Sequence, residues 1–472
     1  MHSSQTPISA HPPASDPVLD GASGFVYDRA ALEGAVDFAL DHAARLGCSD
    51  ASAYASESCG LEVSVRNTEL ESVERSRDKS LGVTVYVGHR SGHASTTDLA
   101  AAAIARTVQA AFDIARFTAE DPCAALPDLA DVVLPAQQRG DLELFFPWLM
   151  STTDATELAL HAERAALELD PRITNSEGGS VAIGQSQFFH AHTHGFRGGY
   201  ASSMHSVFVG VIAGADDAMQ RDGWSCTRRH PLDLESPESI GRRAAERALG
   251  RLGARKLATT ECPVLFEAPV AVGLIGHFVQ AVSGGALYRR SSFLLDALGQ
   301  RVFPEHIDIA EDPFLPRGRG SVPFDAEGVR VQPRNVVEAG TVQGYFLGSY
   351  SARKLGMRTT GNAGGSHNLR LYSRNTTPGD SLEAMLERLG TGLFVTELLG
   401  SGVNPVTGDY SRGACGYWVE RGRIAFPVHE VTIAGNLRTM YQELVAVGAD
   451  AYTLGAKTTG SILLRSMKVA GA

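Results

Sequence analysis

Hydrophobic and polar residues recur along the chain with two different periods, and these periods predict an alternation of helices and strands. Apolar residues at helical spacing follow a candidate N-cap at Asp28, which predicts a first helix. Residues 61–65 and 82–87 alternate apolar and polar side chains, which predicts half-buried antiparallel strands. A second helix is expected over residues 98–117. Together these elements predict an N-terminal α+β unit over residues 28–120.

A proline-rich connection leads from this unit into a second one, residues 121–255. Helical spacing over residues 153–169 is followed by strand-like segments between residues 173 and 213. Another helical segment follows over residues 237–252. We therefore expect a middle α+β unit, which either stands alone or forms one N-terminal domain with the first unit.

The remaining residues, 256–472, carry mostly short strand patterns. An apolar strand at residues 264–266 begins this part of the chain. Residues 336–342 and 418–424 each place a glycine in a short turn between two apolar segments, as β-hairpins do. The predicted fold class is α+β, with N-terminal α/β units containing antiparallel strands followed by a β-rich C-terminal domain.

Composition narrows the class of protein. The 42 Lys and Arg residues against 53 Asp and Glu residues give a net charge of 42 − 53 = −11. No basic stripe with interleaved aromatic residues is present, so we do not expect a nucleic-acid partner. The six cysteines lie far apart without a Cys-x-x-Cys pair, which indicates reduced thiols and a cytoplasmic protein.

Residues 1–27 are rich in Ser, Ala and Pro and lack the charged start and apolar core of a secretion signal, so we expect a disordered tail. The best candidate for a membrane span, residues 269–285, is shorter than the roughly 20 apolar residues that a helix needs to cross a bilayer. We therefore expect no membrane partner.

Candidate chemistry begins with His277, which lies in a strongly apolar segment predicted to be helical. A single histidine in such a segment is more often a hydrogen-bonded core residue than a metal ligand. His190, His192 and His194 occupy alternate positions of a predicted strand and share one face, where they would bind zinc, nickel or copper. The alternative is a polar, solvent-facing strand, and we favour that interpretation.

Two further segments are candidates for binding. The glycine-rich stretch 361–365, followed by His367, exposes backbone amides to a carboxylate or a peptide carbonyl, or else forms a tight turn. It lacks the Lys-Ser/Thr ending of a phosphate loop. Residues 409–412 either line a cleft or form a buried ion pair. No serine or cysteine nucleophile has a recognisable context, which disfavours a serine or cysteine hydrolase.

Several of these segments, in this order, resemble the TldD and PmbA (TldE) family of peptidase-related proteins, and specifically its PmbA branch. The resemblance extends over nearly the whole chain from Asp28 onward. The segments that carry it are 95–99 (STTDL), 172–179 (RITNSEGG), 349–356 (SYSARKLG), 360–365 (TGNAGG), 396–400 (TELLG), 408–413 (GDYSRG) and 432–437 (TIAGNL).

The TldD branch of this family carries a His-Glu-x-x-x-His zinc motif in the corresponding apolar segment. In this sequence the second histidine falls on His277, whereas the first histidine and the glutamate fall on Val272 and Gly273. The family's third ligand, a cysteine, falls near Ile307. Valine offers no lone pair to zinc and glycine offers no carboxylate as a general base, so the resemblance implies that this chain holds no metal.

The resemblance implies a zinc-free PmbA/TldE-type subunit of a metallopeptidase complex that processes or degrades small or unfolded peptides. The implied partner is a TldD-like subunit, which would hold the zinc and carry out catalysis. Two alternatives are a stand-alone peptide-binding or regulatory protein, and a metalloenzyme that uses the three histidines of the predicted strand. The residues that we expect to contact substrate are Gly364, Gly365, His367, Asp409, Ser411 and Arg412.

Overall fold

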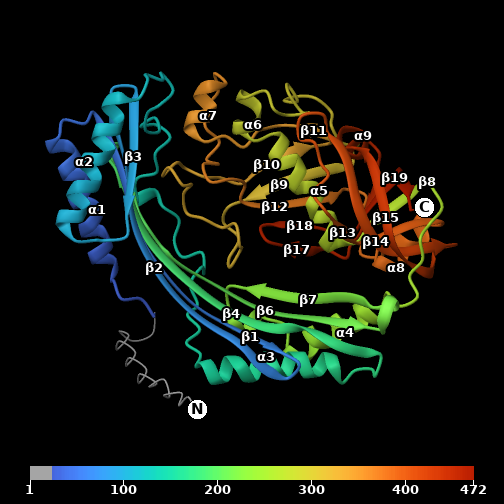
Figure 1. The fold of residues 1–472 in the computed structure, drawn as a ribbon. Helices are drawn as coiled ribbons and strands as arrows, with labels where there is room; N and C mark the ends of the chain where they lie inside the picture. Colours follow the sequence, from blue (N-terminus) through green and yellow to red (C-terminus); the bar gives the residue numbers. More distant parts are fainter. Residues whose placement is uncertain (1–23, 472) are drawn as a thin grey trace, which may run out of the picture.

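The structure is a computed structural model that describes residues 24–471 (Figure 1). Most of the predicted disordered tail, residues 1–23, lies outside the described residues. The described chain is a mixed α+β protein whose sheets are largely antiparallel, which confirms the predicted fold class. Among the described residues, no helix is long and apolar enough to span a membrane.

The N-terminal half is organised by one seven-stranded sheet with the order β3-β2-β1-β4-β6-β7, and the short β5 pairs with β4. Every pairing in this sheet is antiparallel, and strands from both predicted N-terminal units contribute to it. The strands are β1 (Asp50–Arg66), β2 (Glu69–Val87), β3 (Arg90–Thr96), β4 (Ile173–His192), β5 (Arg197–Gly198), β6 (Ala201–Ala213) and β7 (Gln220–Arg228).

Two pairs of helices cover one face of this sheet, because alternate strand residues are apolar on that face only. Residues 51–55 of β1 contribute apolar side chains to a core with α1 and α2, and residues 61–65 contribute to a second core with α3 and α4. Figure 1 shows the pairs at opposite ends of the sheet. The helices are α1 (Arg29–Arg45), α2 (Ala101–Phe117), α3 (Thr152–Leu167) and α4 (Pro237–Gly250).

The helix starts follow from capping side chains in the sequence. The Asp28 carboxylate accepts a hydrogen bond of 2.7 Å from the Ala31 N–H, which confirms the predicted cap of α1. Ser151 and Ser236 cap α3 and α4 in the same way. Helix α2 has no capping side chain and begins at Ala101, three residues later than predicted.

The C-terminal half contains two six-stranded sheets, with the orders β11-β10-β9-β12-β18-β17 and β15-β14-β13-β8-β19-β16. Both predicted hairpins form, and their turns place Ala339-Gly340 and Arg421-Gly422 at positive φ. The strands are β8 (Thr260–Phe266), β9 (Ile307–Asp312), β10 (Arg334–Glu338), β11 (Thr341–Val342), β12 (Asn368–Ser373), β13 (Gly392–Leu399), β14 (Asp409–Glu420), β15 (Arg423–Asn436), β16 (Leu444–Val447), β17 (Tyr452–Leu454), β18 (Lys457–Thr459) and β19 (Ile462–Ala470).

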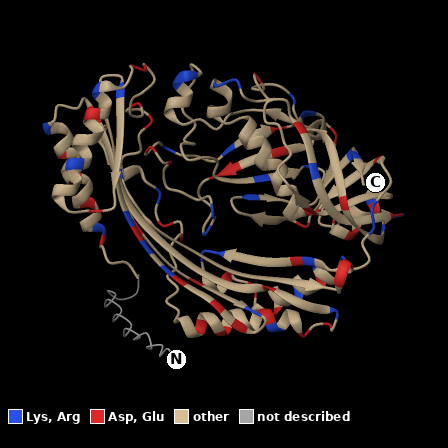
Figure 2. Ribbon diagram, viewed as in Figure 1, with Lys and Arg blue, Asp and Glu red and all other residues tan. Residues whose placement is uncertain are grey.

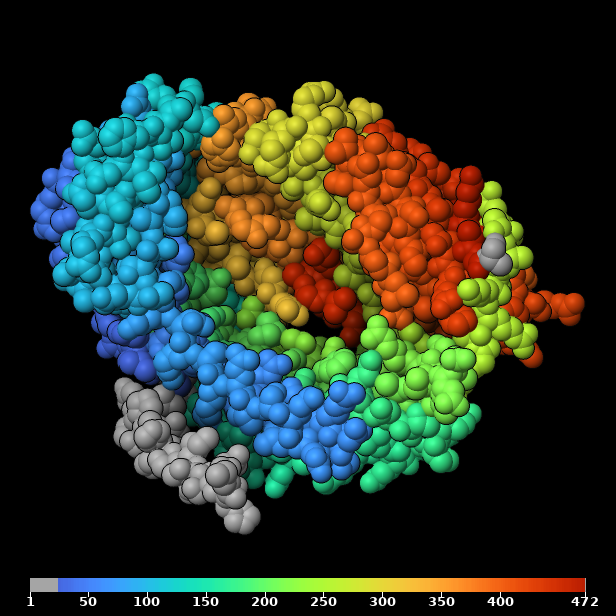
Figure 3. All heavy atoms as spheres, in the orientation of Figure 1, coloured from blue at the N-terminus to red at the C-terminus, as the bar shows by residue number. Residues whose placement is uncertain are grey.

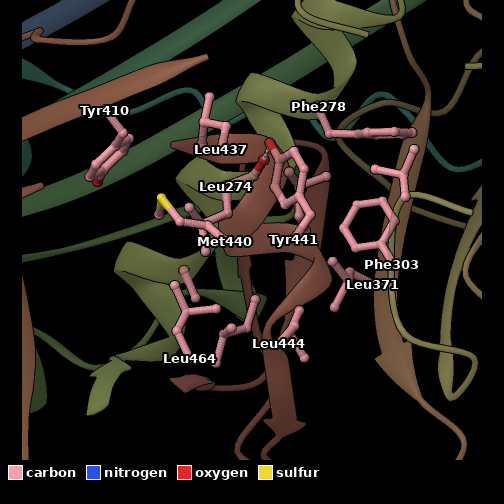
Figure 4. Packing of buried hydrophobic residues seen from close by; sticks show 14 of the residues in the cluster. Leu274, Phe278, Phe303, Leu371, Tyr410, Leu437, Met440, Tyr441, Leu444 and Leu464 are labelled. Atoms are coloured by element: carbon pink, nitrogen blue, oxygen red, sulfur yellow. Dashed lines mark hydrogen bonds between the residues drawn. The ribbon is translucent and has the colours of Figure 1, made fainter. Parts of the chain in front are cut away.

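Helix α5 (Ala268–Ala281) lies in the apolar core of the C-terminal half (Figure 4). Leu274, Ile275 and Phe278 bury one side of the helix in this core. The Tyr441 hydroxyl donates a buried hydrogen bond of 2.9 Å to the Leu274 carbonyl oxygen. The remaining helices are α6 (Gly284–Tyr288), α7 (Ser349–Lys354), α8 (Leu382–Leu389) and α9 (Leu437–Gln442).

An ion-pair network joins the two halves. Arg247 of α4 donates to both carboxylate oxygens of Glu267, the residue that immediately precedes α5, at 2.9 and 3.0 Å. Arg247 and Arg251 also contact Asp222 of β7, and Arg251 pairs with Glu397 of β13. Elsewhere, acidic and basic residues are interspersed over both halves (Figure 2). This network therefore holds the start of α5 against the N-terminal half.

Replacing Arg247 with methionine should lower the free energy of unfolding by about 2–3 kcal/mol, because it leaves the shielded Glu267 carboxylate without its partner. Urea denaturation of the purified chain measures this change. Arg221→Gln is the matched control, because Arg221 forms a more exposed ion pair with Glu177 and should change stability little. Equal stability of Arg247→Met and the wild type would contradict the role assigned to the network.

Candidate functional site

His277 lies near the C-terminal end of α5, half-buried beside strand β14. Its ring meets the Tyr410 ring edge-on, with 6.0 Å between the ring centroids. Burial lowers the pKa of His277, and the nearby Arg412 charge lowers it further. The Tyr410 hydroxyl is buried and has no hydrogen-bond partner within residues 24–471. The group around His277 is therefore a neutral imidazole, a phenol and a guanidinium.

The residues at the positions where the resemblance implies the metal ligands of the TldD branch do not fit zinc. Val272 is buried and apolar, Gly273 has no side chain, and Ile307 is fully buried in the C-terminal core at the start of β9. Nowhere in the described chain do three or more His, Cys, Asp or Glu side chains form a group that could hold a metal ion. His277 alone offers a single nitrogen ligand, whereas protein zinc sites use three or four.

Gly276 directly precedes His277 in the sequence. Helix α5 continues through it from Ala268 to Ala281. A Cβ atom at Gly276 would meet no heavy atom within 4 Å, so close packing does not explain the glycine. Nothing in the structure explains why glycine stands here.

A hollow lies between the open face of the N-terminal sheet and the C-terminal half (Figure 3). One cavity of about 600 Å³ in this region is lined from both sides. The sheet contributes aromatic and hydroxyl side chains, and the C-terminal half contributes residues 320–326 and the glycine-rich loop 363–367. The lining includes Tyr54, Phe188, His190, Tyr200, Phe324, Asp325, Gly364, Gly365 and His367.

The glycine-rich loop is shaped by buried hydrogen bonds. Gly364 and Gly365 have φ angles of 96° and 118°, which side-chain-bearing residues rarely adopt. The buried Glu311 carboxylate accepts hydrogen bonds from the His367 N–H and from Asn362, both at 2.8 Å. His367 Nε2 lies 2.8 Å from the Gly361 carbonyl oxygen. The three predicted contact residues of this loop thus line the cavity, and the buried hydrogen bonds hold the loop in this conformation.

Asp325, which the sequence did not single out, lies at the wall of the same cavity. Burial, together with the nearby charge of Glu327, raises its pKa to about 7. Its carboxylate accepts hydrogen bonds from the backbone N–H groups of Glu327, Val329 and Ala363 at 2.8–3.0 Å. The only local signal is a turn-like Asp-x-x-Gly pattern at residues 325–328, which does not reveal the burial.

The three clustered histidines differ from the favoured prediction of a solvent-facing strand. His190 and His192 are only 8% and 4% exposed, because Phe196 packs against both rings, so that prediction is wrong. His194 lies in the turn after β4, 3.1 Å from the Asp50 carboxylate. His190 Nε2 bonds with a serine hydroxyl at 2.9 Å, and the three rings form no metal-binding group among the described residues.

The second predicted contact group lies on β14 and does not line the 600 Å³ cavity. Asp409 is exposed and bonds with Thr407 and Asn436, whereas Arg412 donates to the Leu398 carbonyl oxygen at 3.4 Å. The predicted alternative of a buried ion pair between Asp409 and Arg412 is therefore wrong. Ser411 is exposed between them.

Acid should destabilise the protein through the buried histidines. Burial lowers the pKa values of His190 and His192 from 6.5 to about 4, so the unfolded chain binds more protons between pH 6.5 and pH 4. Stability contributed by these residues is present above pH 6.5 and is lost as the pH falls towards 4. Asp325 acts oppositely, because its raised pKa removes stability as the pH rises from about 4 to 7.

The variant His190→Gln should therefore lose less stability than the wild type between pH 7 and pH 4, by on the order of 3 kcal/mol. Urea denaturation at each pH measures the difference. His161→Gln is the control, because His161 is exposed on α3. Parallel pH profiles for the wild type and His190→Gln would show that the buried imidazole does not govern acid sensitivity.

Comparison with known proteins shows which domain families and relatives the chain resembles. Three domain families match in order: PmbA/TldA metallopeptidase domain 1 (residues 51–115), its central domain (146–252) and its C-terminal domain (259–471). Metalloprotease PmbA of Escherichia coli O157:H7 is 49% identical over 90% of this chain and 93% of its own length.

Solved structures share the fold. A Bacteroides thetaiotaomicron VPI-5482 protein, described as a candidate modulator of DNA gyrase, superposes with a TM-score of 0.87 at 25% identity, over 93% of this chain and 99% of that one. TldE from Thermococcus kodakarensis gives 0.79 at 20% identity over 93% and 100%, which supports the fold alone. With its domains, its sequence and its fold in agreement, the chain belongs to the PmbA/TldD metallopeptidase family, in the PmbA branch.

Proposed function

We propose that this chain is a zinc-free subunit of a cytoplasmic metallopeptidase complex, in which a TldD-like partner supplies the zinc ion and the general base. The observation that carries this proposal is the group around His277. By the resemblance, one potential ligand remains, whereas Val272 and Gly273 stand at the positions of the other histidine and the base, and the cysteine position falls near Ile307. A reaction that needs metal-bound water therefore depends on residues of another chain.

Electrostatics around His277 support the same assignment. The Arg412 charge already lowers the pKa of His277, which means that a positive charge on the imidazole is disfavoured. A zinc ion coordinated by the imidazole would place two positive charges in the same field. Because no carboxylate or thiolate among residues 24–471 offsets this charge at His277, metal binding there is disfavoured as well.

The part left to this chain is to hold substrate, which we propose to be small or unfolded peptides. The hollow in Figure 3 lies between the two halves and is lined by the glycine-rich loop and by aromatic, hydroxyl and small side chains. Gly364 and Gly365 lack side chains and so let an extended peptide approach the loop backbone. His367 stabilises this loop through its hydrogen bond with the Gly361 carbonyl oxygen.

The complex should be recoverable from the native cell. Tagged protein purified at low salt is expected to bring down a zinc-binding chain with a His-Glu-x-x-x-His motif at a fixed ratio, and peptide cleavage should require both chains. Mass spectrometry and a peptidase assay with and without a chelator measure these properties. Recovery of the tagged chain alone, still able to bind peptides, would favour the stand-alone binding protein instead.

Within that complex, His277→Ala should leave zinc content and cleavage unchanged, because the proposal gives His277 no metal to bind. The matched variant replaces the second histidine of the partner's zinc motif, and it should abolish both. Metal analysis measures the zinc content of each variant complex, and cleavage of an unfolded test peptide measures its activity. Loss of zinc from the complex on His277→Ala would contradict the proposed division of labour.

A further inference from the structure

Three arginines gather where the open face of the N-terminal sheet meets the loop 315–320. Arg228 and Arg229 lie at the end of β7, and Arg319 lies in the loop. A groove of about 690 Å³ runs from Arg229 and Arg319 across the sheet, and we call it the transverse groove. An adjoining cavity of about 330 Å³ is lined by all three arginines.

These arginines have no acidic partners. Among residues 24–471, none of the three forms an ion pair, whereas the neighbouring Arg317 pairs with Glu143 and Asp233. Arg229 is only 9% exposed, and its guanidinium donates to the carbonyl oxygens of Gly318, Ser203 and Arg319. A guanidinium has five N–H groups, so two remain for another acceptor.

A buried guanidinium without a counter-charge is costly, and an anion in the groove would offset that cost. Burial lowers the pKa of Arg229, and the nearby charge of Arg319 adds to this effect. A planar guanidinium fork matches a carboxylate particularly well. The arginine end of the transverse groove is therefore suited to a carboxylate.

The opposite end of the same groove is acidic. Glu74 of β2 and Glu62 of β1 are paired neighbours in the sheet, both line the groove, and both are exposed. Neither carboxylate forms an ion pair within the described chain. This pair would repel a polyanion such as a nucleic acid and would attract an ammonium group.

The sheet register fixes the distance between the two ends. Glu74, Glu62, Ala182, Ser206 and Thr227 are successive cross-strand neighbours on five strands. Arg229 follows Thr227 by two residues, directly after the end of β7, and lines the same groove. Neighbouring strands lie about 4.8 Å apart, so the four steps cover about 19 Å. The residues between the charged ends have small side chains, which leaves the floor of the groove open.

We propose that the transverse groove binds a short peptide with free termini, with its carboxylate at Arg229 and Arg319 and its ammonium group at Glu62 and Glu74. An extended chain advances about 3.3 Å per residue, so about six residues span the charged ends. This inference deepens the proposed function, because it names the class of substrate or product that the hollow holds. Uncharged side chains of many kinds fit the small, hydroxyl-bearing floor.

The test measures peptide binding by isothermal titration calorimetry, with the purified chain in the assembly state in which it is isolated. The ligand is an uncharged Ala/Ser hexapeptide, offered with free termini, with a C-terminal amide or with an acetylated N-terminus. Amidation and Arg319→Gln are each expected to weaken binding about tenfold. Binding of the amidated peptide to Arg319→Gln should be little weaker than with either change alone, because both changes remove the same carboxylate–guanidinium interaction. Acetylation and Glu62→Gln should show the same coupling.

Arg319 and Glu62 are exposed, so their substitution should not disturb folding, and Arg221→Gln on β7 is the control for charge. Tripeptides and amidated peptides with an internal aspartate should bind more weakly than the free hexapeptide. Equal binding of the free and amidated hexapeptides would overturn the proposal, and so would binding of inorganic phosphate without binding of the peptide. Because this assay needs neither zinc nor cleavage, its failure is distinct from a failure to find a catalytic partner.

Discussion

The placement of α5 is the constraint on which the rest of the structure depends. Its apolar side is buried in the C-terminal core, the Tyr441 hydroxyl holds the Leu274 carbonyl, and Arg247 of the N-terminal half holds Glu267 at its start. These contacts fix where His277 meets β14 without any metal ion. Packing and ion pairs therefore supply the stability that holds this helix in position.

The N-terminal sheet provides the other surface of the hollow, and its two faces have different chemistry. One face is covered by α1–α4 and is apolar, whereas the other carries small, hydroxyl and charged side chains and faces the C-terminal half. The ion pair between Arg247 of α4 and Glu267 ties the N-terminal half, which carries this face, to the start of α5. Under the proposed function, this face positions a peptide that residues of the partner chain would cleave.

Local features could be predicted from the sequence because their causes are local. Asp28 caps α1, and the turn at residues 339–340 forms where the hairpin pattern predicts it. The burial of His190 could not be predicted, because it depends on how the Phe196 ring folds back onto the strand, which the alternation of residues does not reveal. The strand pattern alone disfavours the ion-pair alternative for residues 409–412, because residues three apart on a strand point to opposite faces. Asp325 escaped notice because its raised pKa depends on tertiary burial.

The central claim is that this chain holds the position of a zinc site without the site itself. The most direct test is the metal content of the purified chain after incubation with excess zinc and gel filtration, measured by inductively coupled plasma mass spectrometry. The account predicts far less than one zinc ion per chain, and no change on His277→Ala. One zinc ion per chain, lost on His277→Ala, would contradict it.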